Sequence, residues 1–94
     1  MCFTFLGFSG EVCSWLISER SVVGVGVDTV SADHGKSLDF PCHLQISEAD
    51  GFILENVANV DKLPPKGAIL RAYPMKIKGG TGAPTRIIAS LQPI

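Results

Sequence analysis

The 94-residue sequence predicts a small single domain of the α+β (α/β-like) class, because helical and strand patterns alternate along it. Residues 10–20 follow an N-cap signal and carry apolar side chains at helical spacing. Short apolar runs bounded by glycine, proline or aspartate are typical of strands. Apolar residues make up 46% of the chain, which excludes a disordered tail and suggests more apolar surface than so short a chain can bury.

A first helix is expected over residues 10–20. Ser9 is a suitable N-cap, since its hydroxyl can accept a backbone N–H of the first turn. Val12, Trp15 and Leu16 share one face at helical spacing, so we expect this face to pack inward with Trp15 as its anchor. A ligand-stacking role for Trp15 is the alternative.

Residues 22–27, with the sequence VVGVGV, are expected to form a strand that is buried on both faces. Gly24 and Gly26 weaken a strand unless another group packs close to its backbone. The sequence GVGVD is similar to the start of a dinucleotide fingerprint, but the third glycine and the following helix are absent, so we reject that function. Asp28 then either caps a turn or orients a site residue.

The rest of the chain has the pattern of a short helix and three strands separated by turn-rich loops. The helix is expected over residues 42–50, with Gly51 as its stop signal. The strands are expected over residues 52–55, 68–74 and 85–91.

Net charge and cysteine content exclude several classes of function. The net charge is −1 and the basic residues are scattered, which predicts no nucleic-acid partner, and no apolar stretch is long enough to span a membrane. The three cysteines, Cys2, Cys13 and Cys42, are odd in number and form no CxxC motif. They argue against a disulfide framework and favour a reducing, cytoplasmic compartment, with Cys13 and Cys42 as small, semi-buried thiols.

The candidate site consists of His43 and Glu55. A helix from about His43 to Asp50, followed by a strand near residues 52–55, would fold the chain back and let the two side chains meet. An imidazole and a carboxylate in contact can bind a metal or shuttle a proton. The alternative for Glu55 is an exposed charge at a strand end, and His34 is expected to be an exposed loop residue.

Several pieces of the sequence together suggest a family. The pieces LGFSGEVCSWL, VGVGVDTVSAD, FPCH, ILENVANVDKLPPKGA and YPMKIKGGTGAPTRIIA occur in this order. They resemble the C-terminal half of the cyclase-like metal-dependent hydrolases, which include bacterial-type kynurenine formamidase (arylformamidase) and isatin hydrolase. The resemblance runs from about Phe5 to Ala89.

The resemblance implies a partial swivelling β/β/α fold with a mixed sheet, incomplete without an N-terminal half, in which residues 1–94 are the C-terminal portion of one domain. It implies hydrolysis of small-molecule amides, such as N-formyl-L-kynurenine in tryptophan catabolism or cyclic amides such as isatin, with Zn²⁺ or Mn²⁺ as cofactor. His43 and Glu55 match two family positions that ligate the second ion of two-metal members or act as an acid/base pair. Thr81 matches a hydroxyl-bearing position of the glycine loop.

The chain also departs from the family pattern. The principal metal motif, His-x-Gly-Thr-His-x-Asp, does not occur, and the only histidines are His34 and His43. Because a catalytic zinc usually has three protein ligands, we expect the chain alone to be inactive, as a fragment, short isoform or truncated gene model. Its partner would be the missing N-terminal half or further copies in a homo-oligomer. The alternative is a non-catalytic homologue that acts as an interaction module or has no independent role.

Overall fold

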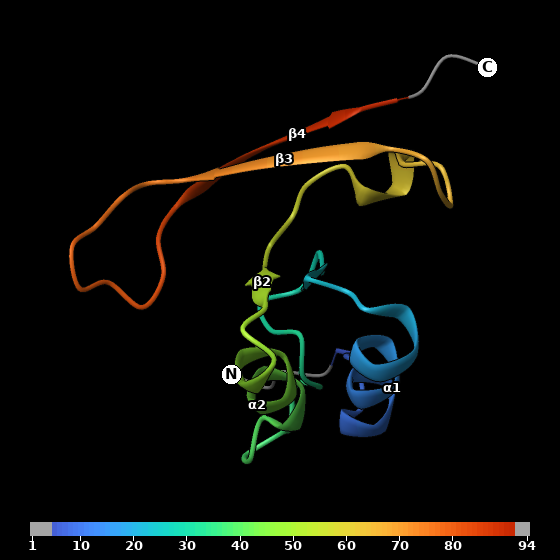
Figure 1. Cartoon of the computed structure of the whole chain (residues 1–94), viewed down its shortest axis with the longest axis vertical. Coiled ribbons are helices and arrows are strands. Elements are labelled where there is room, and N and C mark those ends of the chain that lie inside the picture. The colour runs from blue at the N-terminus through green and yellow to red at the C-terminus, as the bar shows by residue number, and fades with distance from the viewer. Residues whose placement is uncertain (1–4, 92–94) are drawn as a thin grey trace. The chain divides into compact units, whose positions relative to one another are not determined.

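The computed structural model describes residues 5–91, and its helices and strands form an α+β arrangement, which confirms the predicted class (Figure 1). The chain divides into two compact units, residues 1–60 and 61–94. The elements in order are α1 (Gly10–Arg20), β1 (Gly24–Gly26), α2 (Pro41–Glu48), β2 (Phe52–Leu54), the short 3₁₀ helix η1 (Val60–Lys62), β3 (Ile69–Pro74) and β4 (Thr85–Ser90). No helix in the described residues combines the length and the apolar character that a membrane crossing requires.

Helix α1 has the bounds that the sequence predicts. The Ser9 hydroxyl accepts the backbone N–H of Val12 at 3.1 Å and so satisfies one free donor of the first turn. Ser21 ends the helix in the left-handed conformation, with φ of 51°, and its N–H bonds back to the carbonyl of Ile17.

The predicted packing face of α1 is wrong. Cys13 is fully buried and Ile17 packs against the core, whereas the Trp15 side chain is 47% exposed. The guanidinium of Arg20 lies 4.9 Å from the centre of the Trp15 ring, so the indole is covered by a cation on the surface instead of by the core. Helical spacing predicted that the largest side chain, Trp15, would be buried. In the structure the smaller side chain of Cys13 takes the buried position.

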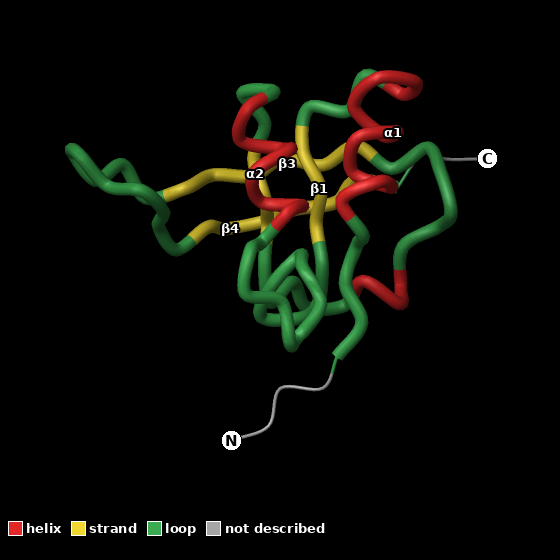
Figure 2. The backbone as a smooth tube through the Cα atoms, turned by 90° about the horizontal axis from the view of Figure 1, so that it is seen from below, coloured by secondary structure: helices red, strands yellow, loops and turns green. Residues whose placement is uncertain are grey.

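The core of the first unit lies where α1 and α2 pack side by side (Figure 2). Four apolar residues are buried there, and five further apolar side chains pack against them. The buried residues are Cys13, Ala32, Cys42 and Ile46, and the partly buried ones are Phe8, Ile17, Val25, Val27 and Ile53.

A disulfide joins Cys13 of α1 to Cys42 of α2, with their Cα atoms 5.6 Å apart. The prediction of free thiols is therefore wrong for these two residues, while Cys2 lies outside the described residues. Helix packing brings together positions that are 29 residues apart in the sequence, and neither an odd cysteine count nor motif spacing reveals such a pairing. The odd number of cysteines therefore no longer supports a reducing compartment.

Strands β1 and β2 pair in parallel, with Gly24 opposite Phe52 and Gly26 opposite Leu54. The Phe52 ring covers Gly24 so closely that a Cβ on the glycine would lie 2.6 Å from it, which explains the glycine in the strand. The prediction that residues 22–27 are buried on both faces is wrong, because Val23 is 73% exposed and the strand has three residues.

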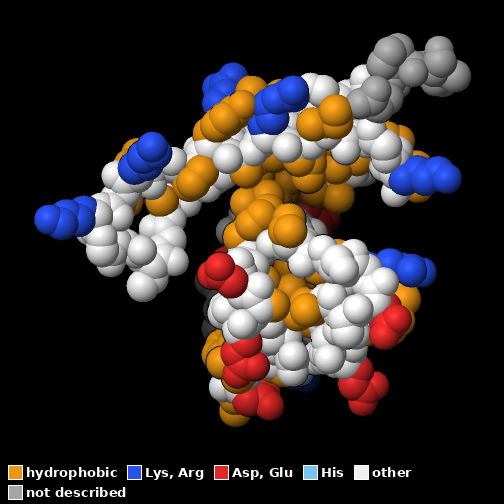
Figure 3. Space-filling model, viewed as in Figure 1, with side chains coloured by type: hydrophobic (Ala, Val, Ile, Leu, Met, Phe, Trp, Pro, Cys, Tyr) orange, Lys and Arg blue, Asp and Glu red, His pale blue; other side chains and the backbone are white. Residues whose placement is uncertain are grey.

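The second unit contains the antiparallel hairpin β3–β4, in which Leu70 pairs with Ala89 and Ala72 with Ile87. These directly opposed residues share one face of the two-stranded sheet, which is therefore apolar. Figure 3 shows hydrophobic side chains gathered over the hairpin. None of the described residues of this unit is buried.

Candidate functional site

The site begins with a buried carboxylate in the loop between β1 and α2. Asp33 is fully buried, and its backbone N–H donates to the Ser31 hydroxyl at 3.2 Å. The N-terminal segment packs against this loop, because the N–H of Phe8 donates to the carbonyl of Ala32 at 2.7 Å. Gly7 contacts the backbone of Asp33 with no room for a side chain, and these contacts fix the position of the carboxylate.

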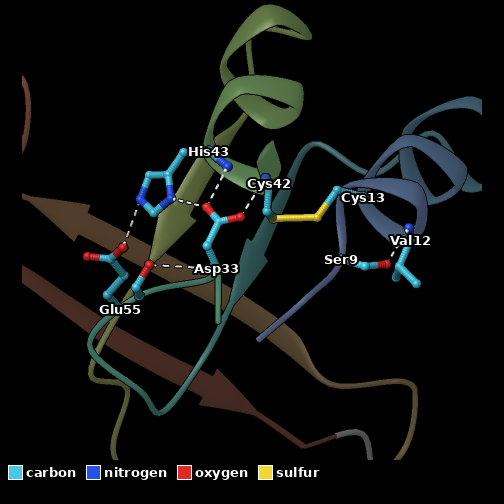
Figure 4. Close-up of a disulfide and its surroundings, with 8 residues drawn as sticks. Ser9, Val12, Cys13, Asp33, Cys42, His43 and Glu55 are labelled. Carbon is cyan, nitrogen blue, oxygen red and sulfur yellow. Dashed lines mark hydrogen bonds and ion pairs between the residues drawn. A yellow bond between two sulfur atoms is a disulfide. The ribbon is translucent and has the colours of Figure 1, made fainter. Parts of the chain in front are cut away.

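Asp33 caps helix α2 from nine residues upstream. Its Oδ1 accepts the N–H of Cys42 at 2.7 Å, and its Oδ2 accepts the N–H of His43 at 3.1 Å (Figure 4). The residue immediately before the helix, Phe40, makes no side-chain cap hydrogen bond. A negative charge at the positive end of the helix, bonded to two free N–H groups, stabilises the first turn.

The same carboxylate holds the imidazole of His43. Nδ1 of His43 lies 2.7 Å from Oδ2 of Asp33, and Nε2 lies 3.0 Å from Oε1 of Glu55 (Figure 4). The His43 side chain is 36% exposed and that of Glu55 33% exposed. The ring thus lies between a buried carboxylate and one at the surface, and its Nε2 side is accessible.

Glu55 is placed by the end of the parallel strand pair. The N–H of Val27 donates to the carbonyl of Leu54 at 2.9 Å, and the N–H of Asn56 donates to the carbonyl of Thr29 at 2.8 Å. These bonds hold the residue after β2 next to the residues that follow β1. The fold-back that the sequence suggested therefore occurs, and it brings Glu55 to His43.

The electrostatics of Asp33 follow from its contacts. Burial desolvates the carboxylate and by itself raises its pKa. The hydrogen bond from the His43 ring and those from the backbone N–H groups of Cys42 and His43 outweigh burial and hold the pKa of Asp33 below its usual value. Asp33 is therefore ionised at neutral pH, and since a carboxylate can only accept, Nδ1 of His43 carries a proton.

The Nε2 side of His43 allows two protonation states. In one, the ring is an imidazolium that donates to an ionised Glu55. In the other, a protonated Glu55 donates to the neutral ring. A proton held between Nε2 and Oε1 could pass to or from a substrate, which is what a general acid or base does.

The other residues that the sequence suggested as candidates are His34, Asp28 and Thr81. His34 is exposed, as expected, and its Nδ1 accepts the N–H of Lys36 at 3.3 Å. Asp28 is exposed, and the carboxylate that orients His43 is Asp33, which the sequence did not single out. Thr81 is an exposed residue of the second unit.

The donor atoms fit a metal ion in type and in spacing. Two atoms that bind one ion at about 2.1 Å, with angles between octahedral and tetrahedral, lie about 3.0 to 3.4 Å apart. Nε2 of His43 and Oε1 of Glu55 are 3.0 Å apart. Within residues 5–91, no group of three or more His, Cys, Asp or Glu side chains is placed to hold an ion, and His43 and Glu55 would supply two donors.

Comparison with known proteins shows related sequences over most of the chain. An isatin hydrolase from Roseibium aggregatum is 39% identical over 88% of this chain and 33% of its own length. A kynurenine formamidase from Polaromonas naphthalenivorans is 32% identical over 78% of this chain and 32% of its own length. Cyclase-like protein 2 from Oryza sativa is 25% identical over 90% of this chain and 31% of its own length. No protein-family profile matches.

A solved structure also shares the fold. Isatin hydrolase A from Ralstonia solanacearum matches 95% of this chain with a TM-score of 0.89 and 41% identity, over 35% of its own chain. The chain therefore spans about a third of the length of the relatives it matches, less than the half that the sequence resemblance suggested. The expected relationship itself is confirmed by sequence and by fold.

Proposed function

We propose that this chain, which is similar to isatin hydrolase and cyclase-like proteins over about a third of their length, supplies part of the active site of an amide hydrolase. The observation that carries the proposal is the 3.0 Å contact between Nε2 of His43 and Oε1 of Glu55. The substrates would be a cyclic amide such as isatin or an N-formyl amide of the kynurenine type, in line with the names of the relatives. Tryptophan catabolism belongs to the same proposal, whereas the Cys13–Cys42 disulfide removes the argument for a cytoplasmic location.

His43 and Glu55 would hold a Zn²⁺ or Mn²⁺ ion, since a neutral imidazole nitrogen and a carboxylate oxygen are ordinary ligands for both. When bound, such an ion lowers the pKa of a coordinated water and polarises an amide carbonyl. The chain's own residues do the positioning: Asp33 holds the ring of His43 by its Nδ1 side and leaves Nε2 next to Glu55. In a site with one metal elsewhere, the same two groups would exchange a proton with the substrate.

The remaining ligands would come from polypeptide beyond the two donors of this chain. A catalytic metal usually has three protein ligands, and the motif His-x-Gly-Thr-His-x-Asp is absent from the sequence. A further family segment with that motif, in the same protein or in a partner, would complete the site.

The metal-binding part is tested by titrating the chain with Zn²⁺ and Mn²⁺ in a calorimeter. We expect one site whose affinity falls at least about tenfold in His43→Ala and in Glu55→Gln, because each variant removes one of two protein ligands. His34→Ala is the matched control and should bind as the wild type does. Equal affinity in His43→Ala and wild type would contradict the proposed ligands.

The catalytic part is tested by turnover of isatin and of a formyl-anilide with either metal added. The chain alone should not exceed the metal blank. Co-expression with the remaining two thirds of an isatin hydrolase should give turnover that Glu55→Gln reduces strongly. Turnover unaffected by Glu55→Gln would show that this carboxylate is not part of the site.

An interaction module is the second candidate function. The hairpin of the second unit favours it, because large apolar side chains are exposed there, among them Leu70 (53%), Tyr73 (55%) and Met75 (59%). The occupant we propose is a polypeptide corresponding to the part of the relatives that this chain does not span. Tight association with such a polypeptide without turnover in the complex would favour this function over the catalytic one.

A further inference from the structure

The Nδ1 atoms of the two histidines face groups of opposite hydrogen-bonding type. Nδ1 of His43 faces the buried carboxylate of Asp33 at 2.7 Å, whereas Nδ1 of His34 faces the backbone N–H of Lys36 at 3.3 Å. A ring nitrogen that faces an acceptor must carry a proton, and one that faces a donor must present a lone pair. The neutral form of His43 therefore has its proton on Nδ1, and that of His34 has its proton on Nε2.

We propose that Asp33 is a positioning residue that fixes the tautomer of His43 and so assigns Nε2 as its metal-binding or proton-transferring nitrogen. The inference rests on the proposed function for the use to which Nε2 is put, but the tautomer itself depends only on contacts within this chain. Ligating histidines commonly donate their other ring N–H to a carboxylate, which sets the ring orientation and raises the basicity of the ligating nitrogen.

Three bonds make this carboxylate hard to reorient. Oδ2 accepts both the backbone N–H and Nδ1–H of His43, at 3.1 and 2.7 Å, while Oδ1 accepts the N–H of Cys42 at 2.7 Å. The side chain is fully buried, so water does not compete for the oxygens. The direction of the imidazole is thereby tied to the first turn of α2, and Nε2 is held toward Glu55.

The arrangement differs from a purely structural helix cap. A cap needs only the two backbone bonds to Cys42 and His43, and these would leave the ring free to turn or to change tautomer. The third bond, from Nδ1, stabilises neither backbone donor, and it determines which nitrogen is left free. Asp33 is not a catalytic residue, because it touches neither Glu55 nor the exposed side of the ring in the contacts described.

The test is the tautomer of each histidine, read from the ring ¹⁵N shifts of the intact chain in long-range ¹H–¹⁵N spectra of the neutral rings. In the wild type we expect His43 protonated on Nδ1 and His34 on Nε2. In Asp33→Ala, His43 should lose the single Nδ1–H tautomer while His34 stays unchanged. A wild-type His43 with its proton on Nε2, or with both tautomers present, would overturn the inference.

A second variant keeps the test decisive if Asp33→Ala does not fold. In Asp33→Asn the amide can place its oxygen toward the N–H of Cys42 and its NH2 group toward Nδ1 of His43, where it meets the lone pair of the other tautomer, so His43 should lose the single Nδ1–H tautomer. An Asn variant in which His43 keeps the single Nδ1–H tautomer of the wild type would show that the carboxylate does not select the tautomer.

Metal affinity gives an independent measurement. Loss of the orienting carboxylate in Asp33→Ala should weaken Zn²⁺ binding about 10- to 100-fold, whereas the same change at the exposed Asp28 should leave it unaltered. Equal weakening in both variants would count against the positioning role. If the wild type binds no metal, the proposed metal site fails, and the ¹⁵N shifts still decide the role of Asp33.

Discussion

At the scale of single residues, Asp33 connects stability to the site. Its carboxylate caps α2, accepts from the ring of His43 and lies fully buried among these partners. Because the partners bind only the ionised form strongly, protonation of Asp33 removes both the helix cap and the orientation of the imidazole. Folding and site geometry therefore depend on the same charge.

The pH dependence of stability follows from the lowered pKa of Asp33. A carboxylate whose pKa is lower in the folded state stabilises the fold above its unfolded pKa, about 3.9, and this stabilisation is lost as the pH falls through the folded pKa. We expect the urea midpoint of the wild type to drop as the pH falls below about 4. Asp33→Asn should be less stable at pH 7 and should change less over the same range. Parallel curves for the two proteins would contradict this contribution.

Gly7 gives a second prediction at this scale. A Cβ on Gly7 would lie 2.6 Å from the carbonyl oxygen of Asp33, so Gly7→Ala must displace the loop that carries the carboxylate. We expect a loss of about 1–3 kcal/mol in the free energy of unfolding, as for other overpacking changes. Gly82→Ala, which meets no atom within 4 Å, is the control and should leave stability nearly unchanged. Equal effects of the two changes would argue against the close contact at Gly7.

Sequence reasoning could predict part of the site. The contact of His43 with Glu55 was predictable because a helix and a strand fold the chain back between them. Asp33 was not, because its three partners lie nine and ten residues away and no local motif marks a cap supplied from that distance. The one usable signal is that α2 begins at Pro41 after Phe40, which cannot cap with its side chain.

At the scale of elements, the packing of α1 on α2 rests on a small core and one covalent link. The bounds of α1 were predictable from Ser9, since N-capping is a local interaction. Its inward face was not, because which side chain is buried depends on α2 and on the disulfide, and both are distant in the sequence. The exposed Trp15 and the buried Cys13 follow from that tertiary context.

The disulfide should account for a large share of the stability of the first unit. Closing a loop with a sequence separation of 29 lowers the entropy of the unfolded chain by about 3–4 kcal/mol in free energy. We expect a reductant to lower the urea midpoint of the wild type and to leave that of Cys13→Ala/Cys42→Ala unchanged. Cys2→Ala should respond to the reductant as the wild type does. Free thiols at Cys13 and Cys42 in air-oxidised protein, detected by alkylation and mass spectrometry, would contradict the link.

At the scale of the whole chain, charge and apolar surface are unevenly distributed. Residues 1–60 contain eight acidic and two basic side chains, whereas residues 61–94 contain one acidic and six basic ones. The basic residues, scattered along the sequence, are therefore concentrated in the second unit. The second unit combines that positive charge with a hairpin whose large apolar side chains are exposed, and an isolated two-stranded hairpin is at best marginally stable in water.

Such a surface should make the chain self-associate when no other partner is present. Exposed apolar patches of this kind mark interaction sites, and burial of the hairpin face removes apolar area from water. We expect sedimentation to show concentration-dependent oligomers that persist in high salt, since salt screens attraction between acidic and basic units but not the hydrophobic effect. Leu70→Lys, on the face without charged residues, should weaken association more than Ile69→Lys on the opposite face, where Arg71 and Arg86 stand among Tyr73 and Ile88. Oligomers that dissociate in high salt and ignore Leu70→Lys would show that the charge division, not the apolar face, drives association.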